Sequence, residues 1–466
     1  MSTTTYGSFP GVRAEVIGGG VNGVIIGEEQ KIVLFGRGDT SGADSAEYNE
    51  PTRITTRVDA NVQFGADTEL SHAVAGALRN GANSEFVYGV MPEEITVSAE
   101  LVAGGSGQLT NYPIVEDLSL IVVNDVSGAS PQEKTPEFVY ESPPNAPSDP
   151  DVVNINPLTG EVETGTPDDH EVDYNYLDWA SALNAADPVL QFNETGVYCT
   201  VSDADAVTQQ LSTKLDDLRP DYKLIRGVAP AQPNATNADG EPIIDVDTYV
   251  DALDNDALYV VGPTRLDGQA PLTLIGGIAG MFAGHPLTDP VYGDRVRGYD
   301  QLIQQLNRSE ESTLRSSYVI PIADQGIAGE GDIYLNDNLS TSTFDDWERD
   351  YHRRRIVDQV LLIGREIGEQ AVNQRLTEEL MKFTEQVMLD EIEELANAGL
   401  LEGSSEQAPN TSGGEATDDG DEEEPYYVEV SQSATDELSV AIGITPIGIA
   451  KRIDETIVVS DAGATA

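Results

Sequence analysis

The chain of 466 residues contains a single cysteine, Cys199, so an internal disulfide bond is excluded. No two of its four histidines occur at metal-ligand spacing, and none has a cysteine partner, so a zinc site is not expected. The longest nearly apolar run, residues 270–284, is too short to span a membrane and rich in glycine. It predicts a buried helix packed closely against a sheet. Residues 1–5 lack the basic start of a signal peptide, and we expect none.

Basic residues are also scarce, with 25 lysines and arginines against 82 aspartates and glutamates, for a net charge of −57. The absence of a basic stripe argues against nucleic-acid binding. The acidic residues occur in every region, whereas a DNA mimic would concentrate them. So large a charge repels a compact state in ordinary buffer, but molar salt shortens the Debye length to about 3 Å. We therefore expect a protein from a halophile.

A chain of this length is too long to fold around a single hydrophobic core, so we expect two to four domains. Apolar periodicity predicts helices at residues 69–79, 177–184, 204–218, 246–253 and through much of 346–398. Strands are predicted at 32–35, 54–58, 85–90, 95–101, 118–123, 137–140, 152–155, 172–176, 196–201, 222–227, 257–261, 426–432, 438–444 and 456–460. Strands alone fill residues 96–172, which predicts a small all-β insert. Alternating strands and helices in 173–283 predict a parallel sheet.

Sequence motifs of enzymes are weak in this chain. Residues 18–23 fit the glycine pattern of a dinucleotide site, but strands follow where that site needs a helix. The acidic run 418–424 lacks the alternating ligand spacing of a calcium loop and reads as a solvated surface. No serine lies in a nucleophile elbow, although a triad of distant residues stays open. We expect no catalytic residue, no cofactor and no metal.

The two ends of the chain are apolar and strand-like, where polar, frayed sequence is usual. An apolar strand at a free end needs a sheet to pair with, and that sheet can lie in another copy. We expect the N-terminal arm to pair through Pro10, Gly11, Val12, Ala14, Val16 and Ile17. The expected C-terminal strand is Thr456, Ile457, Val458 and Val459. The expected receiving hairpin contains Tyr427, Val428, Val430, Val440, Ile442 and Ile444.

A cluster of arginines stands out in this acidic chain. It comprises Arg349, Arg353, Arg354, Arg355 and Arg365. One interpretation is local ion pairing with neighbouring acids, namely Asp345, Asp346, Glu348, Asp350 and Glu366. The other is a docking face, because the guanidinium fork binds carboxylates bidentately.

The order of these parts resembles the contractile tail sheath proteins of myoviruses and related injection machines. Residues 9–16 look like the N-terminal arm of that family, and 33–37 like its next strand. Residues 347–367 are similar to its arginine-containing helix, and 426–460 to its closing hairpin and last strand. The resemblance covers most of the chain apart from the β insert and an acidic loop.

The resemblance implies a multidomain α/β fold. A mixed α/β core domain would be built from N-terminal and C-terminal parts, beside a non-catalytic, subtilisin-like α/β middle region and the inserted β domain. The implied divisions are a linking arm at 1–24, the N-terminal core part at 25–95, an outward-facing β domain at 96–172, the middle domain at 173–345, the C-terminal core part at 346–455 with the acidic loop 402–425, and a linking strand at 456–466.

The resemblance further implies a structural, non-enzymatic subunit that forms hexameric rings stacked helically around a tail tube. Its partners would be other copies, the tube protein, and baseplate and tail terminator proteins, with no nucleic acid and no membrane insertion. Residues Arg349, Arg353, Arg354 and Arg355 would form the tube-facing patch. The acidic composition points to the tail of a haloarchaeal virus, assembled in the host cytoplasm. A cellular injection device, a peptidase and a surface-layer protein are the alternatives.

Overall fold

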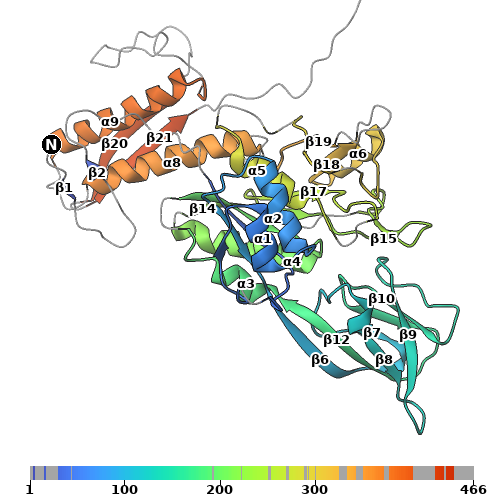
Figure 1. Ribbon diagram of the computed structural model, residues 1–466. Coiled ribbons are helices and arrows are strands. Elements are labelled where there is room, and N and C mark those ends of the chain that lie inside the picture. The colour runs from blue at the N-terminus through green and yellow to red at the C-terminus, as the bar shows by residue number, and fades with distance from the viewer. Residues whose placement is uncertain are drawn as a thin grey trace, which may run out of the picture.

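The computed structural model describes residues 30–42, 45–190, 194–221, 223–249, 253–268, 272–287, 291, 293–299, 301–324, 333–342, 350–371, 377–401, 426–434 and 437–444, together with the short strands β1 (Thr4–Thr5) and β2 (Glu15–Val16). They form a central α/β body, a projecting unit made mostly of strands, and a C-terminal unit of two long helices and a hairpin (Figure 1).

The body is built on an eight-stranded sheet in the order β19-β18-β17-β14-β13-β3-β5-β4. Its strands are β3 (Lys31–Phe35), β4 (Thr52–Arg53), β5 (Val87–Val90), β13 (Thr195–Thr200), β14 (Leu224–Pro230), β17 (Leu258–Gly262), β18 (Val319–Asp324) and β19 (Ile333–Leu335). The six inner strands are parallel, and β4 and β19 are antiparallel edges. Strands β14 and β17 are buried along their whole length, as expected for a parallel sheet covered on both faces.

Helices cover both faces of this sheet. They are α1 (Arg57–Phe64), α2 (Glu69–Arg79), α3 (Trp179–Ala185), α4 (Asp205–Leu218), α5 (Ile275–Gly284) and α6 (Arg308–Ser316). Helix α5 packs on α2 without side chains between them, because Gly276 and Gly280 face the backbone of Ala73 and Ala77. A Cβ at Gly280 would lie 2.5 Å from the Ala77 Cα. The expected buried, glycine-rich helix in 270–284 is confirmed.

The projecting unit is a separate seven-stranded sheet in the order β6-β12-β8-β9-β10-β11-β7. Its strands are β6 (Glu93–Val102), β7 (Ser106–Gln108), β8 (Val122–Asp125), β9 (Gln132–Phe138), β10 (Val152–Ile155), β11 (Glu161–Thr164) and β12 (His170–Asp178). It has a small core of its own around Val123, Val153 and Tyr174. The long antiparallel pair β6 and β12 joins it to the body, with Glu93 opposite Asp178 (Figure 1).

The C-terminal unit contains α8 (Tyr351–Ala371), α9 (Glu378–Asn397) and a hairpin of β20 (Tyr426–Ala434) and β21 (Glu437–Ile444). Thr377 caps α9 by accepting a hydrogen bond from the Leu380 N–H at 3.1 Å. Gly399, with φ of 79°, follows the end of α9 and adopts the left-handed conformation common after a helix C-terminus. The two helices and the hairpin enclose a second core that includes Ile356, Met388 and Val428.

Some expected elements are wrong. Residues 54–58 contain no strand, because the Thr56 hydroxyl accepts a hydrogen bond from the Asp59 N–H and begins α1 there. The described residues 246–249 form a turn and not a helix. The strand expected at 118–123 begins only at Val122, after a short 3₁₀ turn.

The grouping of residues into domains also differs from the expectation. Strands β3 and β5 lie in the same sheet as β13, β14 and β17, so residues 30–90 share their core with the middle region. They do not pair with the C-terminal hairpin, which forms a sheet of two strands. The continuous apolar run of β3 explains the difference, since four successive buried residues need cover on both faces of a sheet.

Candidate assembly interface

The C-terminal hairpin has one buried and one exposed face. Tyr426, Val428 and Val430 are buried against the helices, and Val440, Ile442 and Ile444 pack beside them. The antiparallel register places Val428 opposite Ile442 and Val430 opposite Val440, so the apolar side chains of both strands share this face. Tyr427 and Glu429 point to the other side, and Tyr427 is 50% exposed. The expected pairing of 426–432 with 438–444 is confirmed.

Within the described part of the chain, β20 and β21 pair only with each other. Each strand of a two-stranded sheet directs half of its backbone N–H and C=O groups away from its partner. The hairpin therefore presents two edges to which a further strand can add.

Part of the expected N-terminal arm forms a short ladder, in which Thr4 lies opposite Val16 and Thr5 opposite Glu15. The other expected arm residues, Pro10, Gly11, Val12, Ala14 and Ile17, lie outside the described residues, and so does the whole expected C-terminal strand Thr456–Val459. Strand exchange with a neighbour therefore stays a prediction.

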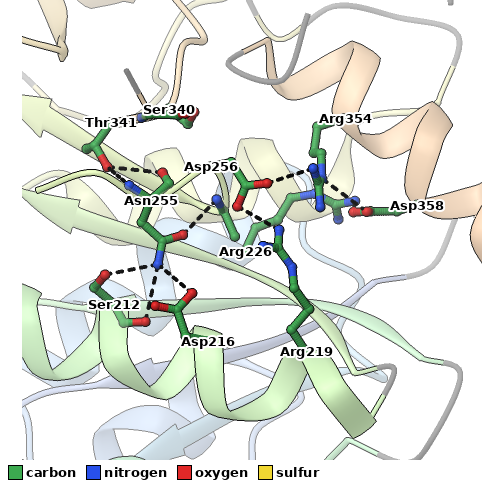
Figure 2. A network of polar contacts seen from close by, with 12 residues as sticks. Ser212, Asp216, Arg219, Arg226, Asn255, Asp256, Ser340, Thr341, Arg354 and Asp358 are labelled. Atoms are coloured by element: carbon green, nitrogen blue, oxygen red, sulfur yellow. Dashed lines mark hydrogen bonds and ion pairs between the residues drawn. The ribbon is translucent and has the colours of Figure 1, made fainter. Parts of the chain in front are cut away.

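The arginine cluster enters a buried polar network at the start of α8 (Figure 2). Arg226, in the middle of β14, is 1% exposed and pairs with Asp358 on α8. Arg354 joins the same carboxylate at 3.2 Å and reaches Asp256 at 2.7 Å. Arg219, at the end of α4, contacts the other oxygen of Asp256 at 2.6 Å. Two aspartates thus hold three arginines between the sheet and α8.

Asn255 extends the network to α4 and to the segment before α8 (Figure 2). Its amide nitrogen donates to the Ser212 hydroxyl at 2.9 Å and to Asp216 at 3.2 Å. Its backbone N–H donates to the Thr341 hydroxyl, which in turn donates to the Asn255 carbonyl oxygen, both at 3.1 Å. These hydrogen bonds join the segment that carries Asp256 to α4 and to Thr341.

Arg355 is buried and also connects α8 to the body. It donates to the carbonyl oxygens of His285 at 2.8 Å and Pro286 at 3.3 Å. The Tyr351 ring lies between two guanidinium groups, with the central carbons of Arg226 and Arg355 each 5.6 Å from its centroid. Burial lowers the pKa of Arg355, because its charged form loses hydration.

These contacts show which described arginines of the cluster are engaged inside their own subunit. Arg354 and Arg355 make contacts inside their own subunit, with partners that differ from the neighbouring acids expected from the sequence. Arg353 is half-buried, and Arg349 lies outside the described residues. Of the four arginines expected in a tube-facing patch, Arg353 is therefore the described one whose side chain is not engaged in this network.

A second buried ion cluster fixes the projecting sheet to the body. Arg265 is 4% exposed and makes two bidentate pairs. It meets Asp203 of the body at 2.5 and 2.9 Å, and Glu116 of the projecting unit at 2.6 and 2.9 Å. The Tyr140 hydroxyl donates to Glu116 at 2.9 Å. Sequence reasoning missed this cluster, since its members are up to 149 residues apart and match no motif.

Glu69, the first residue of α2, faces this cluster. Burial and the nearby charge of Glu116 raise the pKa of Glu69 to about 7. The ends of β3, β13 and β17 meet at this edge, where open α/β sheets usually bind ligands. Here the Arg265 cluster occupies the crevice.

Among the described residues, Cys199, His72, His170 and His285 do not form a hydrolase site of the kind left open by the sequence. Cys199 is fully buried, and burial raises the pKa of its thiol, which opposes nucleophilic chemistry. His285 pairs with Asp294, His72 lies 3.7 Å from Asp67, and the His170 ring contacts the Asp168 carbonyl oxygen. None of these three rings contacts a hydroxyl or a thiol.

The described residues contain no group of three or more histidine, cysteine, aspartate or glutamate side chains arranged to hold a metal ion. None of the helices in this part of the chain is both long enough and apolar enough to cross a membrane.

The fold is similar to that of solved contractile sheath proteins. The contracted helical sheath of the anti-feeding prophage aligns with a TM-score of 0.55 at 13% identity, over 92% of this chain and 93% of that chain. A chain of the anti-feeding prophage baseplate structure aligns with a TM-score of 0.55 at 14% identity, over 98% and 100%. A sheath tail protein from Listeria innocua aligns with a TM-score of 0.51 at 13% identity, over 90% and 92%.

No family model matches the sequence, and the comparison with curated proteins finds no match. At these identities the structural likeness establishes the fold, and it does so over nearly the whole length of the chain.

Proposed function

We propose that this chain is the structural subunit of a contractile tail sheath, which polymerises around a tail tube and contracts to drive the tube through a host envelope. The observation that carries the proposal is the likeness to a contractile sheath protein over more than nine tenths of both chains. A likeness limited to the α/β body would not favour a sheath function, because proteins with many different functions contain such sheets. The open hairpin edges supply a means of polymerisation.

In this proposal the copies are linked by strand exchange. Residues 11–17 of one copy and 456–459 of another add to the edges of β20 and β21 in a neighbour. Backbone hydrogen bonds would provide affinity, and the alternating side chains would set the register. Rigid subunits joined by such arms can change their packing without unfolding.

The tube-facing surface is proposed to include the outer face of α8. Arg353, Val357 and Leu361 follow one another at four-residue intervals, and Leu361 is 46% exposed. A half-polar face of this kind suits a contact that must form before contraction and release afterwards. A structure of the assembled sheath with Arg353 on the outer wall, away from every partner, would contradict this assignment.

The remaining partners and the setting are also part of the proposal. The subunits form hexameric rings, contact the baseplate and a tail terminator, and belong to the virion tail of a halophilic archaeal virus that assembles in the host cytoplasm. The alternative is the sheath of a cellular injection device, which the likeness to the anti-feeding prophage keeps open. Negative-stain imaging of the purified chain in molar salt tests whether sheath-like tubes form at all.

The first prediction concerns the N-terminal arm. Deleting residues 1–18 should leave a folded monomer that sediments as a single species and forms no tubes, because the hairpin of each neighbour loses its added strand. Sedimentation and electron microscopy would measure this. A variant in which 18 residues of the acidic loop 402–425 are removed is the control and should still form tubes. Normal tubes from the arm deletion would rule out strand exchange by this arm.

A further inference from the structure

The projecting unit is held against the body along one seam. Arg265 of the body pairs with Glu116 of the unit at 2.6 and 2.9 Å. The Tyr140 backbone N–H of the unit donates to the Thr236 hydroxyl of the body at 3.3 Å. Tyr140 and Leu158 also pack into the main core. Polar and apolar contacts together therefore close this seam.

The chain crosses between the unit and the body at two neighbouring points. Strand β6 begins at Glu93, two residues after β5 has ended, and β12 ends at Asp178, which lies opposite Glu93. The segment that carries Glu116 belongs to the unit, because the Val115 N–H donates to the Asn175 carbonyl oxygen of β12 at 2.8 Å. A tilt of the unit about the two crossings would therefore move Glu116 away from the body and open the seam.

A cavity of about 40 Å³ lies in the seam beside Arg265. Glu69 of the body and Glu116 and Leu158 of the unit help to line it. A water molecule needs only about 10–15 Å³, so the seam is not close-packed here. Trp179 also lines the cavity and is 3% exposed, and its indole N–H has no hydrogen-bond partner in the described part of the chain. The closed seam thus leaves polar groups incompletely satisfied.

Carboxylates outnumber guanidinium groups around this cavity. Its charged lining residues are Arg37, Glu69, Glu116, Asp203 and Arg265. Arg37 is already paired with Glu94 at 3.2 Å. A wider hollow of about 580 Å³ lies on the other side of Glu69 and Arg37, and its acidic lining residues besides Glu69 are Asp39, Asp67 and Glu94. Glu69 therefore stands between an acidic hollow and a cavity in which two further carboxylates share Arg265.

The surroundings of Glu69 favour its protonated form. Burial has the largest effect on its pKa and the charge of Glu116 the next, and both raise it. The charge of Asp203 also raises the pKa, whereas Arg37 and Arg265 lower it. The nearest repulsive charge thus belongs to the projecting unit and not to the body.

We propose that the seam is a proton-operated latch, which protonated Glu69 keeps closed and ionised Glu69 releases. Glu69, Asp203 and Arg265 are all held in the body, and only Glu116 moves with the projecting unit. An ionised Glu69 repels Glu116 and loses hydration in the closed seam. Tilting the unit away relieves both effects without unfolding the body. All of these groups lie in one copy, so the latch does not depend on the proposed sheath function.

The expected pH dependence follows from the two forms of the latch. The pKa of Glu69 is about 7 in the closed form, and its ordinary value of 4.5 applies once the carboxyl group is hydrated in the open form. Between these values the open form binds fewer protons, so a rise in pH favours opening. The equilibrium constant for opening should rise about tenfold per pH unit between pH 5 and pH 7 and level off above pH 7.

Hydrogen exchange of the unassembled full chain in molar salt tests the latch, because it detects rare openings. The Tyr140 N–H is the reporter, since its hydrogen bond crosses the seam. The Asn156 N–H donates to the Glu161 carbonyl oxygen at 2.8 Å inside the unit and is the reference. After correction for intrinsic exchange rates, the protection of Tyr140 should fall by about a hundredfold from pH 5 to above pH 7. Asn156 should stay at least about tenfold better protected than Tyr140, because the unit remains folded when the latch opens.

Two variants assign the effect to its carboxyl group. Glu69→Gln cannot ionise, so the protection of Tyr140 should not vary between pH 5 and pH 8. Asp67→Asn is the matched control, because this exposed carboxylate lines the outer hollow and not the cavity. It should keep the pH dependence of the wild type.

Three outcomes would overturn the inference. The first is a protection of Tyr140 in the wild type that does not change with pH. The second is equal protection of Tyr140 and Asn156, which would mean that the whole unit unfolds instead of tilting. The third is loss of the pH dependence in Asp67→Asn as well as in Glu69→Gln.

Discussion

Arg226 shows most clearly how one residue sets the relation between two parts of the molecule. It lies in a strand whose seven residues are all buried, where an unpaired charge would be very unfavourable. Asp358 on α8, 132 residues away, neutralises it. A buried pair of this kind contributes little net stability compared with apolar packing, but it joins β14 to α8.

Replacing one partner of this pair should therefore be severe. Asp358→Asn leaves Arg226 and Arg354 without their shared carboxylate and should lower the free energy of unfolding by about 3–5 kcal/mol. Urea denaturation would measure the loss. Glu366→Gln, an exposed change on the same helix, should shift the value by less than about 0.5 kcal/mol. Equal losses in the two variants would mean that the junction is not the source of the stability.

Glu69 provides a prediction on pH. Its pKa is raised from 4.5 to about 7 in the folded chain. Between these two pH values the folded state therefore binds more protons than the unfolded state. The free energy of unfolding consequently falls as the pH rises from about 4.5 to about 7. Glu69→Gln removes this ionisation. The melting temperature of the variant should exceed that of the wild type by a margin that widens from about pH 4.5 to about pH 7 and then stays constant. A margin independent of pH would contradict the assignment.

At the scale of secondary-structure elements, the local sequence correctly predicts an element when its apolar spacing and its capping residues indicate the same bounds. The helix expected at 69–79 is observed with the same bounds, because its apolar spacing coincides with a Thr68 cap and a basic last turn. The hairpin at 426–444 was also predictable, since alternation alone shows which face is buried.

Other features depend on partners that a single sequence does not reveal. Residues 54–58 are β-branched and strand-like, yet a threonine cap turns them into the start of α1. The buried ion cluster around Arg265 is even harder to predict from the sequence. Arg265 meets residues 62 and 149 positions away, and only the fold brings them together. The sequence singled out Arg353–Arg355 by composition but could not separate the buried members from the half-buried one.

The close packing of α2 and α5 leads to a prediction about glycine. Gly280→Ala should lower the melting temperature, because the new methyl group would meet the backbone of Ala77, and overpacking costs about 1–3 kcal/mol. Gly364→Ala on α8 is the matched control. Its nearest neighbour is the end of the flexible Ile442 side chain at 3.1 Å, so the better helix propensity of alanine should raise stability by up to about 1 kcal/mol. Opposite signs in thermal denaturation are expected, and a stabilising Gly280→Ala would exclude the close contact.

At the scale of the whole molecule, the net charge bears on the proposed assembly. Each copy carries a net charge of −57, and a polymer brings these charges within a few ångströms of one another. The repulsion acts over about 10 Å in 0.1 M salt and over about 3 Å in 1 M salt. Charge of this size therefore opposes association of copies as well as the compact state of one copy.

Assembly should accordingly require molar salt. Tubes are expected above about 1 M monovalent salt and should dissociate on dialysis to about 0.1 M, as followed by sedimentation and electron microscopy. Sucrose at matched osmolarity, which does not screen charge, is the control and should not replace the salt. Equal assembly at about 0.1 M salt would refute the halophilic interpretation.

The way the seven-stranded unit joins the body has a consequence for engineering. The chain enters through β6 and leaves through β12, and Glu93 lies opposite Asp178 at the junction. Everything between these positions is a cassette whose two ends are already side by side, so a tight turn or a foreign domain can close the gap. Such a graft needs an acidic group in place of Glu116, because Arg265 would otherwise lose half of its carboxylate contacts. In the proposed sheath, grafted copies would then repeat the foreign domain at regular intervals along the polymer.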